Sequence, residues 1–238
     1  MSGHSKWKNI MHKKEKTDAQ RAKVFTKVGK EIAMAVREGG ADPVANTRLR
    51  DLIVKAKGLN VPNDNIDRII KKASGADGVQ YEAVRYEGYG PGGVAVIVET
   101  ATDNRNRTAG DIRHFFDKYG GNLGTTGCVS YLFAEKGVIV VSEVEDEDAF
   151  MEVALDSGAI DFTVEDGNGE IFTDVNEISS VREALEAKGY KIESADPEKI
   201  PSTYVRLDGE AAEKMEKLLE VLEDNDDVTE VWHNWDEE

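Results

Sequence analysis

The sequence has one cysteine and four histidines among 238 residues, and these shortages exclude several kinds of site. A single thiol, Cys128, cannot form an internal disulfide or a metal site built from several thiolates. It lies in the apolar run 128–133, where a buried, inert thiol is expected rather than a nucleophile. The histidines show no metal-ligand spacing with Cys, Asp or Glu, and no Gly-x-Ser-x-Gly elbow or paired Cys/His signature is present. We therefore expect no catalytic centre, no metal and no cofactor.

Long hydrophobic runs are also missing. No window approaches the roughly 18 consecutive apolar residues of a membrane span. The first residues, Met1 to Trp7, lack the apolar stretch of a secretory signal, and Ser2 excludes N-myristoylation. Together with the lone cysteine, this predicts a reducing, cytoplasmic setting with no membrane partner and no small-molecule substrate.

Basic residues are scarce over most of the chain but not at its start. Residues 76–238 hold 13 Lys/Arg against 39 Asp/Glu, a net charge of −26, whereas residues 1–75 hold 17 against 8, a net charge of +9; together they give the −17 of the whole chain. Exposed charges further apart than a Debye length, roughly 8–10 Å at physiological salt, are largely screened from each other. The front of the chain can therefore present a cationic surface on an anionic protein. This asymmetry points to a polyanionic partner, most simply nucleic acid.

Residues 1–78 are predicted to form an arm and a small helical domain. The arm, residues 1–17, has no helical period. Beyond it, three amphipathic stretches each begin with a capping signal and end at glycine. They cover residues 17–39, residues 42–58, opened by Asp42-Pro43, and residues 62–75, opened by Pro62-Asn63-Asp64. Because each has a single apolar stripe, the three helices have to pack on one another.

After residue 78, strand patterns alternate with helical ones. From residue 137 the order is strand, helix, strand, strand, helix, strand, which is typical of the ferredoxin-like split motif. Two further strand–helix–strand units flank it, with strands expected at 94–98, 129–133, 204–207 and 228–232. We therefore predict an α+β protein in which a helical domain precedes two ferredoxin-like α/β domains. The inserted one covers residues 135–201, and the discontinuous outer one is built from 79–134 and 202–238.

Basic residues are densest in the arm and on the first helix. They are Lys6, Lys8, His12, Lys13, Lys14 and Lys16 around Trp7 in the arm, and Arg21, Lys23, Lys27 and Lys30 on the helix. Such cations neutralise phosphates and release condensed counterions, and Trp7 could stack on an unpaired base. The alternative is a solvated helix face and tail, with the tryptophan packed on the helical domain. The length of the basic run and the acidity of the rest favour binding.

A second cationic element is the segment 102–108, Thr-Asp-Asn-Arg-Asn-Arg-Thr, between an apolar strand and the start of a helix. Arg105 and Arg107 beside a helix N-terminus make an anion site plausible, because guanidinium groups and exposed N–H groups both bind phosphate oxygens. The alternative is a helix cap with its arginines paired to nearby carboxylates. The sequence leaves both interpretations open.

The glycine-rich segment 88–93, Gly-Tyr-Gly-Pro-Gly-Gly, joins two predicted strands. It lacks the Gly-Lys-Ser/Thr ending of a phosphate-binding P-loop and does not lead from a strand into a helix. It therefore predicts a hairpin turn.

These elements resemble the signatures of the YebC/PmpR family. The matching stretches are Gly3-His4-Ser5-Lys6-Trp7, Asn9-Ile10, His12-Lys13-Lys14, Pro62-Asn63-Asp64-Asn65-Ile66, residues 88–93 and residues 102–108. The resemblance spans the whole chain and implies a cytoplasmic protein with a helical N-terminal domain and two α/β domains. It also implies a role in gene expression. The family is labelled as probable transcriptional regulators, with DNA binding in some members. A mitochondrial relative is a translational activator of cytochrome c oxidase subunit one, and other members are linked to ribosomes stalled on proline-rich stretches.

The kind of nucleic acid is not decided by charge, since DNA, ribosomal RNA and tRNA all present phosphates. No motif resembles a helix-turn-helix recognition helix or a zinc finger, which favours recognition of shape and backbone over base edges. We therefore predict a non-enzymatic, DNA-binding regulator of transcription that acts through its basic N-terminal domain. The alternative is a ribosome- or RNA-binding translation factor that assists synthesis through stalling sequences. A protein partner would be expected at the acidic C-terminal domains, for example along residues 224–238.

Overall fold

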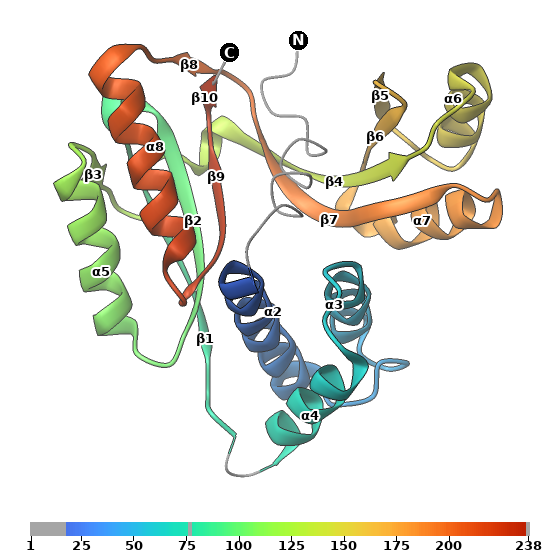
Figure 1. Ribbon diagram of the computed structural model, residues 1–238, viewed down its shortest axis with the longest axis horizontal. Coiled ribbons are helices and arrows are strands. Elements are labelled where there is room, and N and C mark those ends of the chain that lie inside the picture. Colours follow the sequence, from blue (N-terminus) through green and yellow to red (C-terminus); the bar gives the residue numbers. More distant parts are fainter. Residues whose placement is uncertain (1–17, 76–77, 237–238) are drawn as a thin grey trace. The chain divides into compact units, whose positions relative to one another are not determined.

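The computed structural model describes residues 18–75 and 78–236 (Figure 1). Contacts divide these residues into two compact units. Residues 134–200 form one, which we call the inserted unit, and the remaining described residues form the larger unit. No helix in the described ranges is long and apolar enough to span a membrane.

The larger unit begins with three helices, α2 (Asp18–Gly39), α3 (Thr47–Gly58) and α4 (Asn63–Ser74). Their apolar stripes meet in one core, in which Ile32, Leu49 and Ile66 are buried. The predicted three-helix arrangement is confirmed. Burial of each such side chain contributes roughly 1.5–3 kcal/mol, so packing rather than intrinsic propensity holds these short helices together.

The predicted start of the second helix was wrong. Asp42 caps a turn instead, because its carboxylate accepts a hydrogen bond from the backbone N–H of Val44 at 2.9 Å. The helix begins after Asn46, whose side-chain oxygen accepts from the backbone N–H of Leu49 at 3.0 Å. The Asn46 amide group also donates to the carbonyls of Ala35 and Gly40 at 2.8 Å. An aspartate at position 46 could accept from Leu49 but could not make these two donations.

The central domain of the larger unit is a four-stranded antiparallel sheet with two helices on one face (Figure 1). Its elements are β1 (Glu82–Tyr89), β2 (Ala95–Thr102), α5 (Arg105–Lys118), β3 (Asn122–Leu123), α8 (Gly209–Asp224) and β9 (Val228–His233). The strands lie in the order β3-β1-β2-β9. Phe116 of α5 and Leu218 of α8 are fully buried in the core that includes Val96 and Val98 of β2.

This sheet is ferredoxin-like, but two of the strands expected for it were wrong. β2, α5 and β3 form a split βαβ unit with β1 inserted between the two strands. Thus β1 takes the place expected for residues 204–207, and β3 the place expected for residues 129–133.

The misassigned segments have other roles. Residues 130–132 form a short 3₁₀ helix, because the buried carboxylate of Glu87 accepts hydrogen bonds from the N–H groups of Val129 and Ser130, both at 3.0 Å. In β8 (Val205–Arg206), the chain pairs only with β10 (Trp235–Asp236), as a separate parallel pair.

The glycine-rich segment is a hairpin turn between β1 and β2, as its sequence predicts. The N–H of Gly90 donates to the carbonyl of Val94 at 2.7 Å and closes the turn. Gly92 has a φ of +65°, and a β-carbon there would collide with the side chain of Leu207. The positive φ therefore favours glycine at this position, and any larger residue would also have to displace the end of the Leu207 side chain.

The inserted unit has the predicted strand–helix–strand–strand–helix–strand order. Its elements are β4 (Phe133–Ser142), α6 (Glu147–Asp156), β5 (Asp161–Glu165), β6 (Asn168–Thr173), α7 (Ile178–Ala187) and β7 (Lys191–Pro201). The sheet order is β5-β6-β4-β7, with β4 and β5 on either side of β6. Phe150, Ile171 and Leu185 are fully buried in its core. This is the ferredoxin-like arrangement, so the predicted fold class is confirmed.

Candidate nucleic-acid interface

Three lysines that the sequence nominated for phosphate binding, Lys23, Lys27 and Lys30, lie along α2; we call them the α2 lysine row. They meet residues 223–227, which cover the end of α8 and the turn that leads to β9; we call this segment the acidic turn. Lys23 pairs with Asp224, and Lys27 donates to the backbone carbonyl of Glu223. Lys30 lies 2.7 Å from a carboxylate oxygen of Asp227 and 2.8 Å from the carbonyl of Asp226. Within the larger unit, carboxylates therefore compensate the charges of Lys23 and Lys30, and Lys27 is held at a backbone carbonyl.

Asp227 is the centre of this contact. Its side chain is only 6% exposed, and its carboxylate lies 2.7 Å from Lys30, 2.7 Å from Arg107 and 2.8 Å from the hydroxyl of Thr108. Burial alone would raise the pKa of Asp227. The hydrogen bonds from Arg107, Lys30 and Thr108 outweigh that effect and lower the pKa to about 2. The carboxylate is therefore ionised at neutral pH and joins α2, α5 and β9.

The arginine segment 102–108 is built around the same carboxylate. The side chain of Asn104 caps α5 by accepting from the N–H of Arg107 at 3.1 Å, and the hydroxyl of Thr108 lies 2.7 Å from that of Thr102. Arg107 pairs with both Asp103 and Asp227 at 2.7 Å, and these hydrogen bonds raise its pKa. Arg107 thus follows the helix-cap interpretation.

Arg105 differs from Arg107. It is exposed at the first position of α5, and its side chain forms no ion pair with the part of the chain that the structure describes. Its backbone carbonyl lies 3.5 Å from the hydroxyl of Tyr86. Of the two arginines that the sequence singled out, only Arg105 presents an uncompensated guanidinium to solvent.

A different set of cations on the helical domain is exposed and uncompensated. We call these side chains of α3 and α4 the α3–α4 cations: Arg50, Lys57, Arg68, Lys71 and Lys72. None of them forms an ion pair within residues 18–75 and 78–236, whereas Arg48 pairs with Glu38 and Lys55 with Glu31 and Glu230. Sequence reasoning missed this set. The helical spacing of the sequence could have identified it, because Lys71 and Lys72 lie on the face of α4 opposite the buried Ile66.

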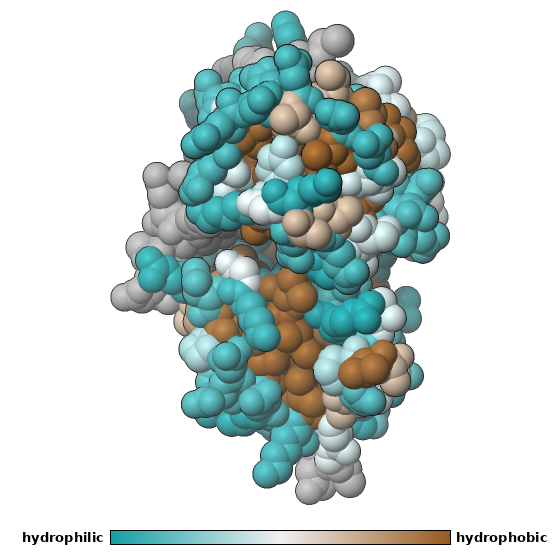
Figure 2. Space-filling view, turned by 90° about the vertical axis from the view of Figure 1, so that its right-hand side faces the viewer, coloured by the Kyte–Doolittle hydropathy of each residue, from teal (hydrophilic) through white to brown (hydrophobic). Residues whose placement is uncertain are grey.

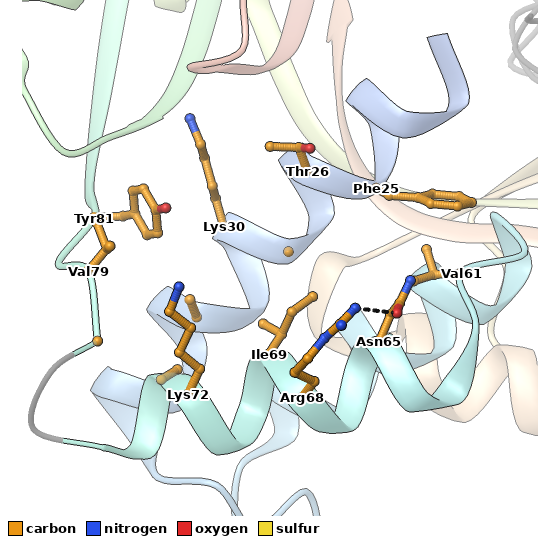
Figure 3. A pocket seen from close by; sticks show the side chains of 14 residues that line it. Phe25, Thr26, Lys30, Val61, Asn65, Arg68, Ile69, Lys72, Val79 and Tyr81 are labelled. Atoms are coloured by element: carbon orange, nitrogen blue, oxygen red, sulfur yellow. Dashed lines mark hydrogen bonds between the residues drawn. The ribbon is translucent and has the colours of Figure 1, made fainter. Parts of the chain in front are cut away.

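Two of these cations line a pocket of about 290 Å³ between α2, α4 and the segment that leads to β1; we call it the α2–α4 pocket (Figure 3). Tyr81 and Val79 lie at one end and Phe25 and Val61 at the other, with Ile69 between them (Figure 3). Lys30 comes from α2, and Arg68 and Lys72 come from α4. No carboxylate side chain is among the lining residues.

Part of the apolar surface of the helical domain is open to solvent. Val44 is 84% exposed and Val54 is 40% exposed. In the lower half of Figure 2, brown hydrophobic residues form a patch that teal hydrophilic residues border. The domain therefore offers apolar surface next to cations, a combination that suits bases and phosphates together.

The remaining predicted site residues are in the arm: Lys6, Trp7, Lys8, His12, Lys13, Lys14 and Lys16 lie outside the described residues. Arg21, on the first turns of α2, is exposed. In the described ranges, no group of three or more His, Cys, Asp or Glu side chains is placed to hold a metal ion.

Comparison with known families accounts for nearly the whole chain. Residues 5–76 match the TACO1/YebC protein N-terminal domain, and residues 81–235 match the TACO1/YebC second and third domain. The chain belongs to the TACO1/YebC family. The resemblance noted from the arm, the glycine turn and the arginine segment is thereby confirmed.

Similar proteins of this family cover the chain from end to end. A "Probable transcriptional regulatory protein" from Acetivibrio thermocellus is 58% identical over 239 residues, which are 99% of each chain. Another of the same description, from Caldicellulosiruptor bescii, is 57% identical and covers 100% of this chain and 99% of its own. A conserved hypothetical protein from Aquifex aeolicus, known from a crystal structure, has 48% identity and a TM-score of 0.83, with 92% of each chain covered.

Proposed function

We propose that this protein is a non-enzymatic regulator of gene expression in the cytoplasm that binds nucleic acid, with DNA as the first candidate, through its basic N-terminal domain. The description of its relatives as probable transcriptional regulatory proteins supports a regulatory role. The +9 and −26 division of charge supports a polyanionic partner for the front of the chain.

One observation carries the proposal further, namely the presence of the α3–α4 cations. Residues 18–75 hold 12 Lys/Arg against 7 Asp/Glu, and among these cations the acidic turn pairs with Lys23 and Lys30 of the α2 lysine row. The five side chains of α3 and α4 are left to act on a partner. Binding phosphates would release counterions without first breaking an ion pair of the protein, as contacts from Lys23 or Lys30 would require.

The interface we propose therefore combines three parts. The α3–α4 cations are the first, and the arm with Lys13 and Lys14 at its centre is the second. Arg105 on α5 is a third contact. Arg107 and the α2 lysine row position the domains rather than bind phosphates, because their charges already face Asp227 and its neighbours.

Fluorescence anisotropy tests this proposal directly. The full-length protein is titrated into labelled duplex DNA and into labelled single-stranded RNA at several salt concentrations. We expect affinity to fall linearly on a log–log plot, with a slope of about −0.9 per neutralised phosphate for the duplex and about −0.7 for the single strand. Replacement of Lys217, an exposed lysine of α8, by alanine is the matched control and should leave both slopes unchanged. The absence of binding to either probe at low salt would refute the proposal.

The second candidate is a translation factor that binds ribosomal RNA or tRNA. It is favoured by the apolar and cationic α2–α4 pocket, because unpaired bases are common in RNA loops and are not offered by a regular DNA duplex. Crosslinking in cells followed by sequencing of the bound nucleic acid separates the candidates. A transcription regulator yields promoter DNA, whereas a translation factor yields ribosomal RNA or tRNA.

A further inference from the structure

We propose that the α2–α4 pocket takes one unpaired nucleotide of a single-stranded nucleic acid, with its base against the apolar walls and the phosphates on its two sides at Arg68 and Lys72. This inference rests on the proposed function and names the part of the nucleic acid that the helical domain recognises. It follows from the shape of the pocket, its lining and the compensation of charge around it.

The walls of the pocket suit a flat, weakly polar group. Phe25 and Ile69 provide half-buried apolar surface, and the buried Val61 lies at the same end as Phe25 (Figure 3). Tyr81 closes one end, where burial, followed by the charges of Asp103 and Asp227, raises its pKa and keeps the phenol protonated. Every nucleobase has two flat faces that pack on aromatic and apolar side chains whatever its sequence. The pocket can therefore hold a base without reading its identity.

The charge of the pocket suits phosphates at its rim. Arg68 and Lys72 are four residues apart on the same face of α4, and in Figure 3 their charged ends point toward opposite ends of the pocket, so each is placed for a different phosphate of the strand. The guanidinium of Arg68 donates to the side-chain oxygen of Asn65 at 2.5 Å, which fixes its direction without neutralising it (Figure 3). Lys30, by contrast, forms an ion pair with Asp227, so it contributes its hydrocarbon stem to the pocket rather than a free charge. The net charge offered to a ligand is therefore positive.

The size of the pocket limits which kind of anionic ligand it can hold. At about 290 Å³ it lies at the lower end of the range for small-molecule sites, which suits one nucleotide rather than a folded segment. A base inside a duplex is stacked and paired, and extruding it costs a few kcal/mol. An acidic peptide would satisfy Arg68 and Lys72 but would leave the surface of Phe25 and Ile69 unused. A single strand offers both a base for the apolar walls and phosphates for Arg68 and Lys72.

Lys71 and Lys72 provide a matched pair of variants to test this. Both are exposed lysines of α4 without an ion pair in the described chain, but only Lys72 lines the pocket. The probe is a labelled oligoadenylate of about 12 nucleotides, a length within the site sizes of single-strand binders. We expect Lys72→Ala to weaken its binding on the order of ten-fold, and Lys71→Ala to weaken it several-fold less. Tyr81→Phe keeps the ring and should bind like the wild type, whereas Tyr81→Leu should not.

A second measurement detects the base itself. The same oligonucleotide is prepared with 2-aminopurine at one position in turn, and with an abasic site at the same positions. At the position that enters the pocket, the fluorescence of 2-aminopurine should change on binding, and the abasic probe should bind on the order of ten-fold more weakly. Lys72→Ala should abolish that position-dependence, while Lys71→Ala retains it.

The outcomes separate this inference from the proposed function. If the wild-type protein binds neither single strand nor duplex, the proposed function fails and the pocket inference fails with it. If it binds oligoadenylate but the abasic probes bind equally well and the two lysine variants behave alike, the pocket inference is overturned and the proposed function stands. If a polyglutamate peptide displaces oligoadenylate from the wild type but not from Lys72→Ala, the pocket recognises acidic peptides instead.

Discussion

Neutralising Asp227 without changing its shape tests the contact between α2 and the central domain. In Asp227→Asn, the side chain keeps an oxygen for Thr108 but loses the charge that faces Lys30 and Arg107. The carboxyl has an ordinary pKa of 3.8 and a pKa of about 2 in the folded protein. This difference corresponds to about 2 kcal/mol of stability at neutral pH. We therefore expect the free energy of unfolding to fall by about 2 kcal/mol.

The same reasoning fixes the pH dependence. A pKa that is lowered on folding stabilises the protein above the pKa of the unfolded state, and the stabilisation is lost as pH falls through the folded-state pKa. The contribution of Asp227 should be complete above about pH 5, about half as large near pH 3 and small near pH 2. The difference between wild type and Asp227→Asn should shrink in the same way.

Urea unfolding followed by tryptophan fluorescence measures this difference, since Trp232 lies on β9, the strand that follows Asp227. Asp226→Asn is the control, because Asp226 is exposed and gives Lys30 only its backbone carbonyl. It should change the stability by less than about 0.5 kcal/mol. If Asp227→Asn matched the wild type at pH 7, or if its deficit stayed constant down to about pH 3, the assigned role of this carboxylate would be refuted.

Three further predictions concern the arm, the first helix–helix connection and the hairpin. Lys13→Ala combined with Lys14→Ala should weaken binding to all nucleic acids and flatten the salt slope by about one unit per lost phosphate contact; an unchanged slope would remove the arm from the interface. Asn46→Ala should destabilise the protein by about 2 kcal/mol or more in urea unfolding, because a helix cap and two buried hydrogen bonds are lost; Asn63→Ala, at the exposed start of α4, should cost far less. Gly92→Ala should lower the stability by about 1–3 kcal/mol, since its φ is positive and its β-carbon would collide with a leucine; an unaltered denaturation midpoint would contradict that packing.

Much of the fold could be predicted because local signals agree with the tertiary structure. The three helices and the inserted unit could be predicted from the spacing of apolar residues and from the glycines and asparagines at the ends of elements. The errors lie where contacts with residues distant in the sequence determine the local structure. Residues 129–133 are as apolar as a strand, but the carboxylate of Glu87 holds their first turn as a 3₁₀ helix. Of residues 204–207, Val205 and Arg206 form a strand, and within the described residues it pairs only with β10.

The candidate interface, like the fold, could be predicted from the sequence only in part. Sequence alone nominated Lys23, Lys27 and Arg107, because lysines and arginines beside a helix are typical of phosphate sites. It could not foresee that the acidic turn brings carboxylates to Lys23, 201 residues away, and to Arg107, 120 residues away, and a backbone carbonyl to Lys27. The acidic run at 223–227 was visible, but its pairing with α2 requires the sheet to be assembled first. Conversely, the cations of α4 form no ion pair with residues 18–75 or 78–236, and the sequence around them gives no sign of this.

The central claim is that cations of α3 and α4, rather than the α2 lysine row, bind phosphates. It is tested most directly by the salt dependence of nucleic-acid binding in two variants of the full-length protein. We expect Lys57→Ala/Lys71→Ala/Lys72→Ala to flatten the slope on duplex DNA or single-stranded RNA by about two to three units, and Lys23→Ala/Lys27→Ala to leave it unchanged. A flattened slope in the α2 variant together with a wild-type slope in the α3–α4 variant would contradict the claim.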